Sequence, residues 1–127
     1  MNLLLDSCAL IGLTNGTLPE AAHAALESCN FAYTSLVSPW EIAIKAKSGK
    51  LTLPKPAEKW FCEIREEYDL IELPLLADTA CAAADLPLIH RDPFDRVLIA
   101  TAQEKNLILI TSDRTIPKYP GVKCLWN

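Results

Sequence analysis

The chain has 127 residues, of which half are hydrophobic and 22% are charged. That length suits one domain with its own core, and that composition excludes an intrinsically disordered chain. The net charge is −4, so a wide basic face that holds nucleic acid by charge alone is excluded as well. An acidic protein can still act on nucleic acid where bound cations reverse the local charge.

The five cysteines form no C-x-x-C pair. This pattern argues against a disulfide framework or a zinc site, and for free thiols in a reducing compartment. The N-terminus has neither the basic region nor the long apolar region of a signal peptide. No apolar run approaches the roughly 20 residues that a membrane-spanning helix needs. We therefore expect a cytoplasmic protein without a membrane segment.

Strands and helices alternate in the first half of the chain. The apolar run Leu3–Leu5 indicates a strand that is buried on both faces. Ser7 is the expected cap of the helix that follows, and Ser38 with Pro39 is a typical helix start. In chain order we expect a strand at 3–5, helices at 7–13 and 19–28, a strand at 31–37 and a helix at 39–48.

The same alternation continues in the second half. We expect a helix at 57–67, a strand at 70–73, a helix at 75–84, a helix from Asp92-Pro93 to about 105, and strands at 107–110 and 122–126. Apolar strands that alternate with helices predict an α/β fold with a largely parallel sheet. We therefore expect a single domain over residues 1–127, with about five strands and helices on both faces of the sheet.

Three acidic residues are expected at one edge of this sheet. Asp6 follows the first strand directly, and Asp113 lies three residues after Ile110 at the end of a later strand. Glu41 lies in the first turn of a helix that begins after another strand. Ligands of open parallel sheets bind at the carboxyl ends of the strands. Each acid also has an ordinary structural interpretation, because Asp starts turns and an acid in a first turn favours the helix dipole.

Two further carboxylates lie in the segment His90–Arg96, H-R-D-P-F-D-R. Asp92 fits the N-cap position, Pro93 fits the first helical position, and Asp95 falls where a capping box has its second acid. Glutamate or glutamine is preferred there, so Asp95 suits that capping role less well. It shares a helix face with apolar residues, and an unpaired buried carboxylate is costly. We therefore assign Asp92 to capping and Asp95 to an inward-facing site.

Four acids could thus converge on one edge: Asp6, Glu41, Asp95 and Asp113. Ligation by oxygen alone suits Mg²⁺ or Mn²⁺ rather than zinc. Clustered carboxylates repel one another, so without a cation some of their pKa values would rise. One use of such clusters is metal-assisted hydrolysis of phosphodiesters.

Four ordered blocks of the sequence resemble the PIN-domain ribonucleases, and most closely the VapC-type toxins of type II toxin–antitoxin systems. The blocks are L-L-L-D-S-C-A-L at 3–10, S-P-W-E-I-A-I-K-A-K-S-G-K-L at 38–51, H-R-D-P-F-D-R-V-L-I-A-T-A at 90–102, and L-I-T-S-D-R at 109–114. They span nearly the whole chain in the family's order. The resemblance implies a PIN-like domain that cleaves RNA with metal-activated water.

The resemblance also implies roles for individual residues. It makes Asp6, Glu41 and Asp95 the central ligands of Mg²⁺ or Mn²⁺, and Asp113 a more peripheral fourth acid. Ser7 and Asp92 are possible auxiliary residues, and Lys45, Lys50 and Arg96 are possible contacts for RNA phosphates. His90 is not required as a general base in the family. A loop histidine beside Arg91 is more typical of a surface residue or a hydrogen-bond partner.

The implied partners are an RNA substrate, a cognate antitoxin protein and a second copy of the chain. Antitoxins of this family wrap the toxin with a segment that folds on binding, and DNA would be reached only through the antitoxin. The apolar helices around Ala21–Leu26 and Trp60-Phe61 could supply the surface of a homodimer, although core packing is the more ordinary use of most of those side chains.

Three other functions fit less well. A signalling receiver domain needs an acidic pair after the first strand and a lysine after the last main strand, whereas here Ser7-Cys8 follows Asp6. A phosphatase that forms an aspartyl-phosphate needs a second acid where Cys8 stands. A non-catalytic PIN-like binding module would not need all four acids.

Overall fold

The five expected strands form one sheet in the computed structural model of the chain, residues 1–127, and every neighbouring pair is parallel. The strand order is β3-β2-β1-β4-β5. Leu5, at the end of β1, pairs with Thr34 of β2 on one side and with Ile110 of β4 on the other. The strands are β1 (Asn2–Leu5), β2 (Phe31–Ser35), β3 (Ile71–Leu73), β4 (Ile108–Ile110) and β5 (Lys123–Leu125).

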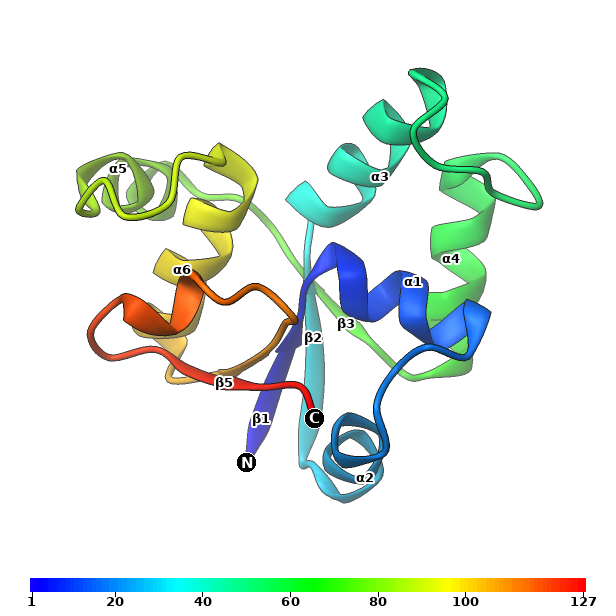
Figure 1. The fold of residues 1–127 in the computed structure, drawn as a ribbon, viewed down its shortest axis with the longest axis horizontal. Coiled ribbons are helices and arrows are strands. Elements are labelled where there is room, and N and C mark those ends of the chain that lie inside the picture. The colour runs from blue at the N-terminus through cyan, green and yellow to red at the C-terminus, as the bar shows by residue number, and fades with distance from the viewer.

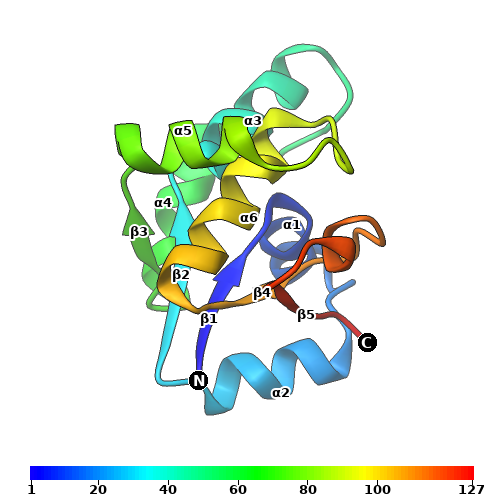
Figure 2. The ribbon, with the colours of Figure 1, turned by 90° about the vertical axis from the view of Figure 1, so that its left-hand side faces the viewer.

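Helices cover both faces of the sheet (Figures 1 and 2). One core cluster joins the sheet to α1, α2 and α4, and a second joins it to α6, against which α5 packs. The helices are α1 (Ser7–Asn15), α2 (Glu20–Ser28), α3 (Val37–Lys47), α4 (Ala57–Glu67), α5 (Ala77–Asp85) and α6 (Pro93–Lys105), with a short 3-10 helix η1 (Ile116–Lys118). None of them is long and apolar enough to cross a membrane. The expected α/β architecture is confirmed.

Strand β1 shows why this sheet is buried on both sides. Leu3 and Leu5 point into the cluster beneath α1 and α4, whereas Leu4 points into the cluster beneath α6. All three side chains are essentially without solvent contact. Burying each leucine stabilises the fold by roughly 1.5–3 kcal/mol, so the short run L-L-L fixes the centre of the domain.

Helix α3 begins earlier than the sequence predicted. It starts at Val37 and not at Pro39, because β2 already ends at Ser35, whose hydroxyl accepts a hydrogen bond from the Val37 N–H at 3.2 Å. Ser38 therefore lies inside the helix and is not its cap, and its buried hydroxyl has no hydrogen-bond partner. The earlier start moves Glu41 out of the first turn, where the helix dipole would act on it most strongly.

The connections place a topological switch point beside β1. The chain builds outward from β1 to β2 and β3, then returns to add β4 on the other side of β1. Where a strand order reverses in this way, the connections diverge and leave a crevice at the carboxyl edge. Asp6 follows β1 and Asp113 follows β4, so these two acids flank that crevice.

Candidate metal centre

Asp6 is held rigidly at the junction of β1 and α1. Its backbone N–H donates to Ile110 O of β4 at 3.2 Å, and its Oδ1 accepts a hydrogen bond from the Ala9 N–H at 2.8 Å. Asp6 is thus the N-cap of α1, a role that the sequence assigned to Ser7. Asp6 is 6% exposed, so its carboxylate is held away from bulk water.

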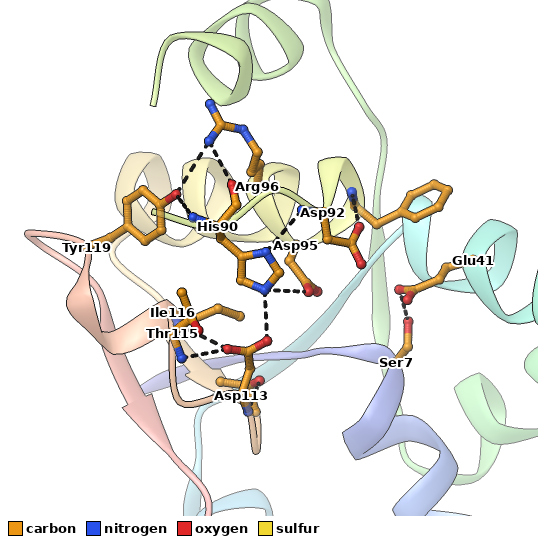
Figure 3. Close-up of polar contacts among 12 residues, drawn as sticks. Ser7, Glu41, His90, Asp92, Asp95, Arg96, Asp113, Thr115, Ile116 and Tyr119 are labelled. Atoms are coloured by element: carbon orange, nitrogen blue, oxygen red, sulfur yellow. Dashed lines mark hydrogen bonds and ion pairs between the residues drawn. The ribbon is translucent and has the colours of Figure 1, made fainter. Parts of the chain in front are cut away.

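Ser7 and Lys45 hold the second acid, Glu41, from opposite sides. The Ser7 hydroxyl donates to Glu41 Oε1 at 2.7 Å, and Lys45 Nζ lies 2.9 Å from Oε2 (Figure 3 shows the Ser7 contact). Ser7 is free for this contact because Asp6 caps the helix. Glu41 is buried, and the paired contacts satisfy both of its oxygens within the chain.

The structure separates Asp92 from Asp95 as the sequence suggested. Asp92 is the N-cap of α6, with Pro93 in the first helical position, and its Oδ1 accepts a hydrogen bond from the Phe94 N–H at 2.9 Å. Asp95 makes no capping-box contact, because the Asp92 N–H donates instead to His90 Nδ1 at 3.1 Å. Asp95 is therefore free to face the crevice, where its Oδ2 lies 3.1 Å from His90 Nε2.

Asp113 closes the opposite side of the site. Its Oδ1 accepts hydrogen bonds from the Thr115 N–H at 2.7 Å and the Ile116 N–H at 3.3 Å, which fixes the turn after β4. Its Oδ2 lies 2.8 Å from His90 Nε2 (Figure 3). Asp113 is more exposed than Asp6, Glu41 or Asp95, which agrees with the peripheral position expected for it.

His90 is the central residue that sequence reasoning left unassigned. A backbone N–H can only donate, so the contact from Asp92 makes Nδ1 an acceptor and places the ring hydrogen on Nε2. That single N–H points between Asp95 Oδ2 and Asp113 Oδ2. Of the two ordinary interpretations, the structure supports the hydrogen-bond partner, and the His90 side chain is only 14% exposed. Its place two residues before the cap of α6 is the one sequence signal that could have revealed it.

The four acids line one cavity of about 220 Å³ at the carboxyl edge of the sheet. They come from four elements or their ends: β1, α3, α6 and β4. Its full lining is Asp6, Ser7, Cys8, Glu41, Lys45, Asp92, Asp95, Ser112 and Asp113. The convergence that the sequence suggested is thus present, with one hydrophobic residue among nine in the lining.

The cavity brings several carboxylates close together and partly removes them from water, and both effects change their pKa values. Burial, with smaller contributions from Glu41 and Asp113, raises the pKa of Asp6 to about 6. Burial and the nearby carboxylates, Asp92 foremost, raise the pKa of Asp95 to about 7. For Asp113, burial is outweighed by hydrogen bonds from His90 and the following backbone, and the pKa is lowered. Asp6 and Asp95 therefore lose their protons at a higher pH than an ordinary aspartate does.

This set of groups fits a hard divalent cation. The donors are carboxylate oxygens, which suit Mg²⁺ and Mn²⁺. A carboxylate oxygen of Asp95 and one of Asp113 lie within 4.8 Å of each other, close enough to share an ion. The raised pKa values of Asp6 and Asp95 mark charge that a cation would neutralise. Lys45 is the only lysine or arginine in the lining, and its amine is paired with Glu41.

The three basic residues proposed as phosphate contacts have different positions. Lys45 lies at the rim of the cavity and is about half exposed. Lys50 is exposed in the turn after α3 and does not line the cavity. Arg96 is 8% exposed, and its guanidinium donates to backbone carbonyls of the segment before α6. The prediction that Arg96 contacts RNA phosphate is therefore wrong, because the side chain is buried and its guanidinium is bonded within the fold.

Comparison with known proteins identifies relatives of the whole chain. The PIN domain family model matches residues 3–122. The ribonuclease VapC22 of Mycobacterium tuberculosis (strain ATCC 25618 / H37Rv) is 29% identical over 112 residues, which are 86% of this chain and 85% of that protein.

Solved structures with the same fold include two that contain a binding partner. VapBC2 from Rickettsia felis, solved bound to a DNA fragment from its promoter, superposes with a TM-score of 0.73 at 15% identity over the full length of both chains. A toxin–antitoxin complex from Klebsiella pneumoniae superposes with a TM-score of 0.67 at 25% identity over 94% of each chain.

Proposed function

Because the chain belongs to the PIN domain family, we propose that it is a metal-dependent endoribonuclease and the toxin of a toxin–antitoxin module. The observation that carries this proposal is the convergence of Asp6, Glu41, Asp95 and Asp113 on one cavity at the switch point of the sheet. Its relative VapC22 is named a ribonuclease, which is the activity this acidic cavity suits.

The four acids would hold Mg²⁺ or Mn²⁺. Such an ion, when bound, lowers the pKa of water and neutralises charge on a phosphodiester. The residues of the chain then have separate tasks. Ser7 fixes one oxygen of Glu41, the backbone of α1 fixes one oxygen of Asp6, and the turn after β4 fixes one oxygen of Asp113. The second oxygen of Glu41 pairs with Lys45 and that of Asp113 with His90, so a bound ion would compete with these two contacts.

Lys45 is the residue best placed to meet the substrate. Its amine is half exposed at the rim, next to Glu41. A phosphate oxygen that approaches the acids passes this amine, which can exchange its contact with Glu41 for one with the phosphate. No side chain needs to act as a nucleophile, since the attacking group is water.

The partners follow from the same family. Similar structures are toxin–antitoxin complexes, and one of them is bound to promoter DNA. We therefore propose that this chain binds an antitoxin, acts as a homodimer in the cytoplasm, and reaches DNA only through that antitoxin. The side chains of Trp60 and Phe61 would not take part in such a dimer surface, because both are buried in the core.

The receiver alternative is wrong. Receiver domains have the strand order 2-1-3-4-5, whereas this sheet has the order 3-2-1-4-5. The phosphatase alternative lacks its second acid, because Cys8 stands in that place. A non-catalytic module is the remaining alternative, and activity distinguishes it from the nuclease.

The decisive experiment is RNA cleavage by the purified full chain with Mg²⁺ or Mn²⁺, with and without EDTA. Asp6→Asn and Asp95→Asn should each lower the rate about 100-fold or more, since metal assistance contributes several kcal/mol. Asp69→Asn is the matched control, because Asp69 is exposed and its positive φ of 52° also suits asparagine. Cleavage that persists in EDTA, or in both active-site variants, would exclude this mechanism.

A further inference from the structure

Arg96 is a buried charge that forms no salt bridge. It is 8% exposed, and such a charge is costly unless hydrogen bonds compensate for the lost water. Here the closest of these hydrogen bonds go to backbone carbonyls. Nη1 donates to Pro87 O at 3.0 Å and His90 O at 3.1 Å, and Nη2 donates to Ala84 O at 3.1 Å and Leu86 O at 2.7 Å. Every one of these carbonyls lies in the short segment from the end of α5 to His90.

Tyr119 holds the same segment from the other side. Its hydroxyl donates to Pro87 O at 2.7 Å and accepts a hydrogen bond from the His90 N–H at 2.7 Å. Arg96 Nη1 also lies 3.4 Å from this hydroxyl (Figure 3). Tyr119 is 2% exposed and follows η1, the turn that Asp113 begins. The segment is thus fastened to α6 and to the chain after β4 at once.

This polar clamp, formed by Arg96 and Tyr119, is what determines the course of the segment. The two large apolar residues at its tip are not anchored in the core, since Leu88 is 79% exposed and Ile89 is 41% exposed. The segment from Leu86 to Asp92 also lies outside the helices and strands. Leu86 at the start of the segment packs against the second core cluster. Beyond it, from Pro87 to His90, hydrogen bonds to Arg96 and Tyr119 hold the segment in place of apolar packing.

The clamp ends at His90, whose polar groups are all engaged. Tyr119 accepts its N–H, Arg96 donates to its C=O, and the Asp92 N–H donates to Nδ1. The remaining group, Nε2–H, has one direction left to point. It lies 2.8 Å from Asp113 Oδ2 and 3.1 Å from Asp95 Oδ2.

We propose that Arg96 and Tyr119 are positioning residues that seat His90, and that the Nε2–H of His90 holds Asp95 and Asp113 together as one half of the metal centre. This inference rests on the proposed function, which supplies the metal. It assigns His90 to orienting the acids and not to binding the ion, because its ring hydrogen faces them. It also links α5, α6 and the chain after β4 to the geometry of two acids.

The clamp can be measured without metal. We expect ¹⁵N NMR of the full chain at pH 8 to show the His90 ring as a single Nε2–H tautomer. Tyr119→Phe removes the hydroxyl contacts with little change in volume. Arg96→Lys keeps the positive charge but removes the guanidinium group, whose two terminal nitrogens donate to four carbonyls. Both should convert the His90 signal to a mixture of tautomers. Tyr68→Phe is the matched control, because its hydroxyl bonds a carbonyl, Leu13 O, remote from the cavity.

Metal affinity is the second measurement, with Mn²⁺ as the probe. Residues that orient ligands typically change metal affinity by about 10–100-fold when substituted, so Tyr119→Phe and His90→Ala should each weaken Mn²⁺ binding at least tenfold. His90→Gln retains an N–H donor and should restore part of the loss. Tyr68→Phe should bind Mn²⁺ like the unaltered chain even if its melting temperature falls.

Four results would overturn all or part of the inference. A His90 tautomer that is unchanged in Tyr119→Phe and Arg96→Lys would show that the clamp does not seat the ring. Mn²⁺ affinity that is unchanged in His90→Ala would remove its role in the metal centre, and a directly bound histidine nitrogen in pulsed EPR of Mn²⁺ would make it a ligand. A chain that neither binds Mn²⁺ nor cleaves RNA would refute the proposed function and the metal role together, while the tautomer would still decide the clamp.

Discussion

The Ser7 hydroxyl donates a 2.7 Å hydrogen bond to Glu41 Oε1, which joins the residue after the first acid to the second acid across 34 positions of sequence. A hydrogen bond to a charged group contributes about 1.5–3 kcal/mol. Without it, Glu41 keeps only its contact with the half-exposed Lys45. The arrangement makes Ser7 a support of the site and not a cap of its helix.

Ser7→Ala should therefore lower the rate of RNA cleavage roughly tenfold, because it frees one oxygen of Glu41. The measurement is cleavage under single-turnover conditions at saturating Mn²⁺. Ser28→Ala is the control, since Ser28 bonds only carbonyls of its own helix. An equal loss in both variants would assign the effect to helix stability and not to Glu41.

We expect substitutions of Asp92 and Asp95, the two carboxylates of the H-R-D-P-F-D-R segment, to have different effects on RNA cleavage. Asparagine is as good an N-cap as aspartate, so Asp92→Asn should keep cleavage within about threefold of the unaltered chain. Asp95→Asn should lower it about 100-fold or more. Circular dichroism of both variants checks that α6 remains folded. If the two effects were reversed in folded proteins, the assignment of capping and metal roles would be wrong.

The sequence predicted the acids of the site better than the residues that hold them. Asp6 and Asp113 follow apolar strands, and a parallel sheet brings the ends of its strands to one edge whatever the loops do. Asp95 could be separated from Asp92 by local helix geometry alone. These inferences depend on periodicity and capping, which act over a few residues and are visible in sequence.

The supports depend on long-range packing, and the sequence does not show it. Arg96 lies on the same helix as Asp95, and nothing in its spacing shows that its guanidinium turns to the carbonyls of the preceding segment. Tyr119 follows a 3-10 helix that was not predicted. The earlier start of α3 has a local cause instead: β2 ends at Ser35, whose hydroxyl accepts a hydrogen bond from the Val37 N–H two residues later.

Lys45 should affect substrate binding more than chemistry. Its amine is about half exposed, and exposed ion pairs contribute about 0.2–1 kcal/mol, so Lys45→Met should raise KM about two- to fivefold with little change in kcat. Lys47→Met is the control, because Lys47 is on the same helix but does not line the cavity. A fall in kcat with unchanged KM would instead place Lys45 among the groups that act on the reacting phosphate.

The metal-free protein should lose stability as the pH rises through the neutral range. The pKa values of Asp6 and Asp95 are raised to about 6 and about 7 from 3.8, first of all by burial. Between about pH 4 and pH 7 the folded state therefore holds protons that the unfolded state has released. Because the unfolded state binds fewer protons there, the free energy of unfolding falls as the pH rises through this range. Asp113 has the opposite sign, because its pKa is lowered, and its contribution is lost only in acid.

Asp95→Asn tests this directly, since it removes the most strongly shifted carboxylate. One unit of pKa shift corresponds to about 1.4 kcal/mol, and solvent screening reduces the total, so the variant should be roughly 1–3 kcal/mol more stable than the parent at pH 8 in EDTA. At pH 4 the difference should vanish, because the parent carboxyl is then protonated. Mn²⁺ at pH 8 should reverse the order by stabilising only the parent. Thermal unfolding at both pH values, with Asp69→Asn as the control, measures all three effects; a variant that is less stable than the parent at pH 8 in EDTA would show that Asp95 is not electrostatically strained.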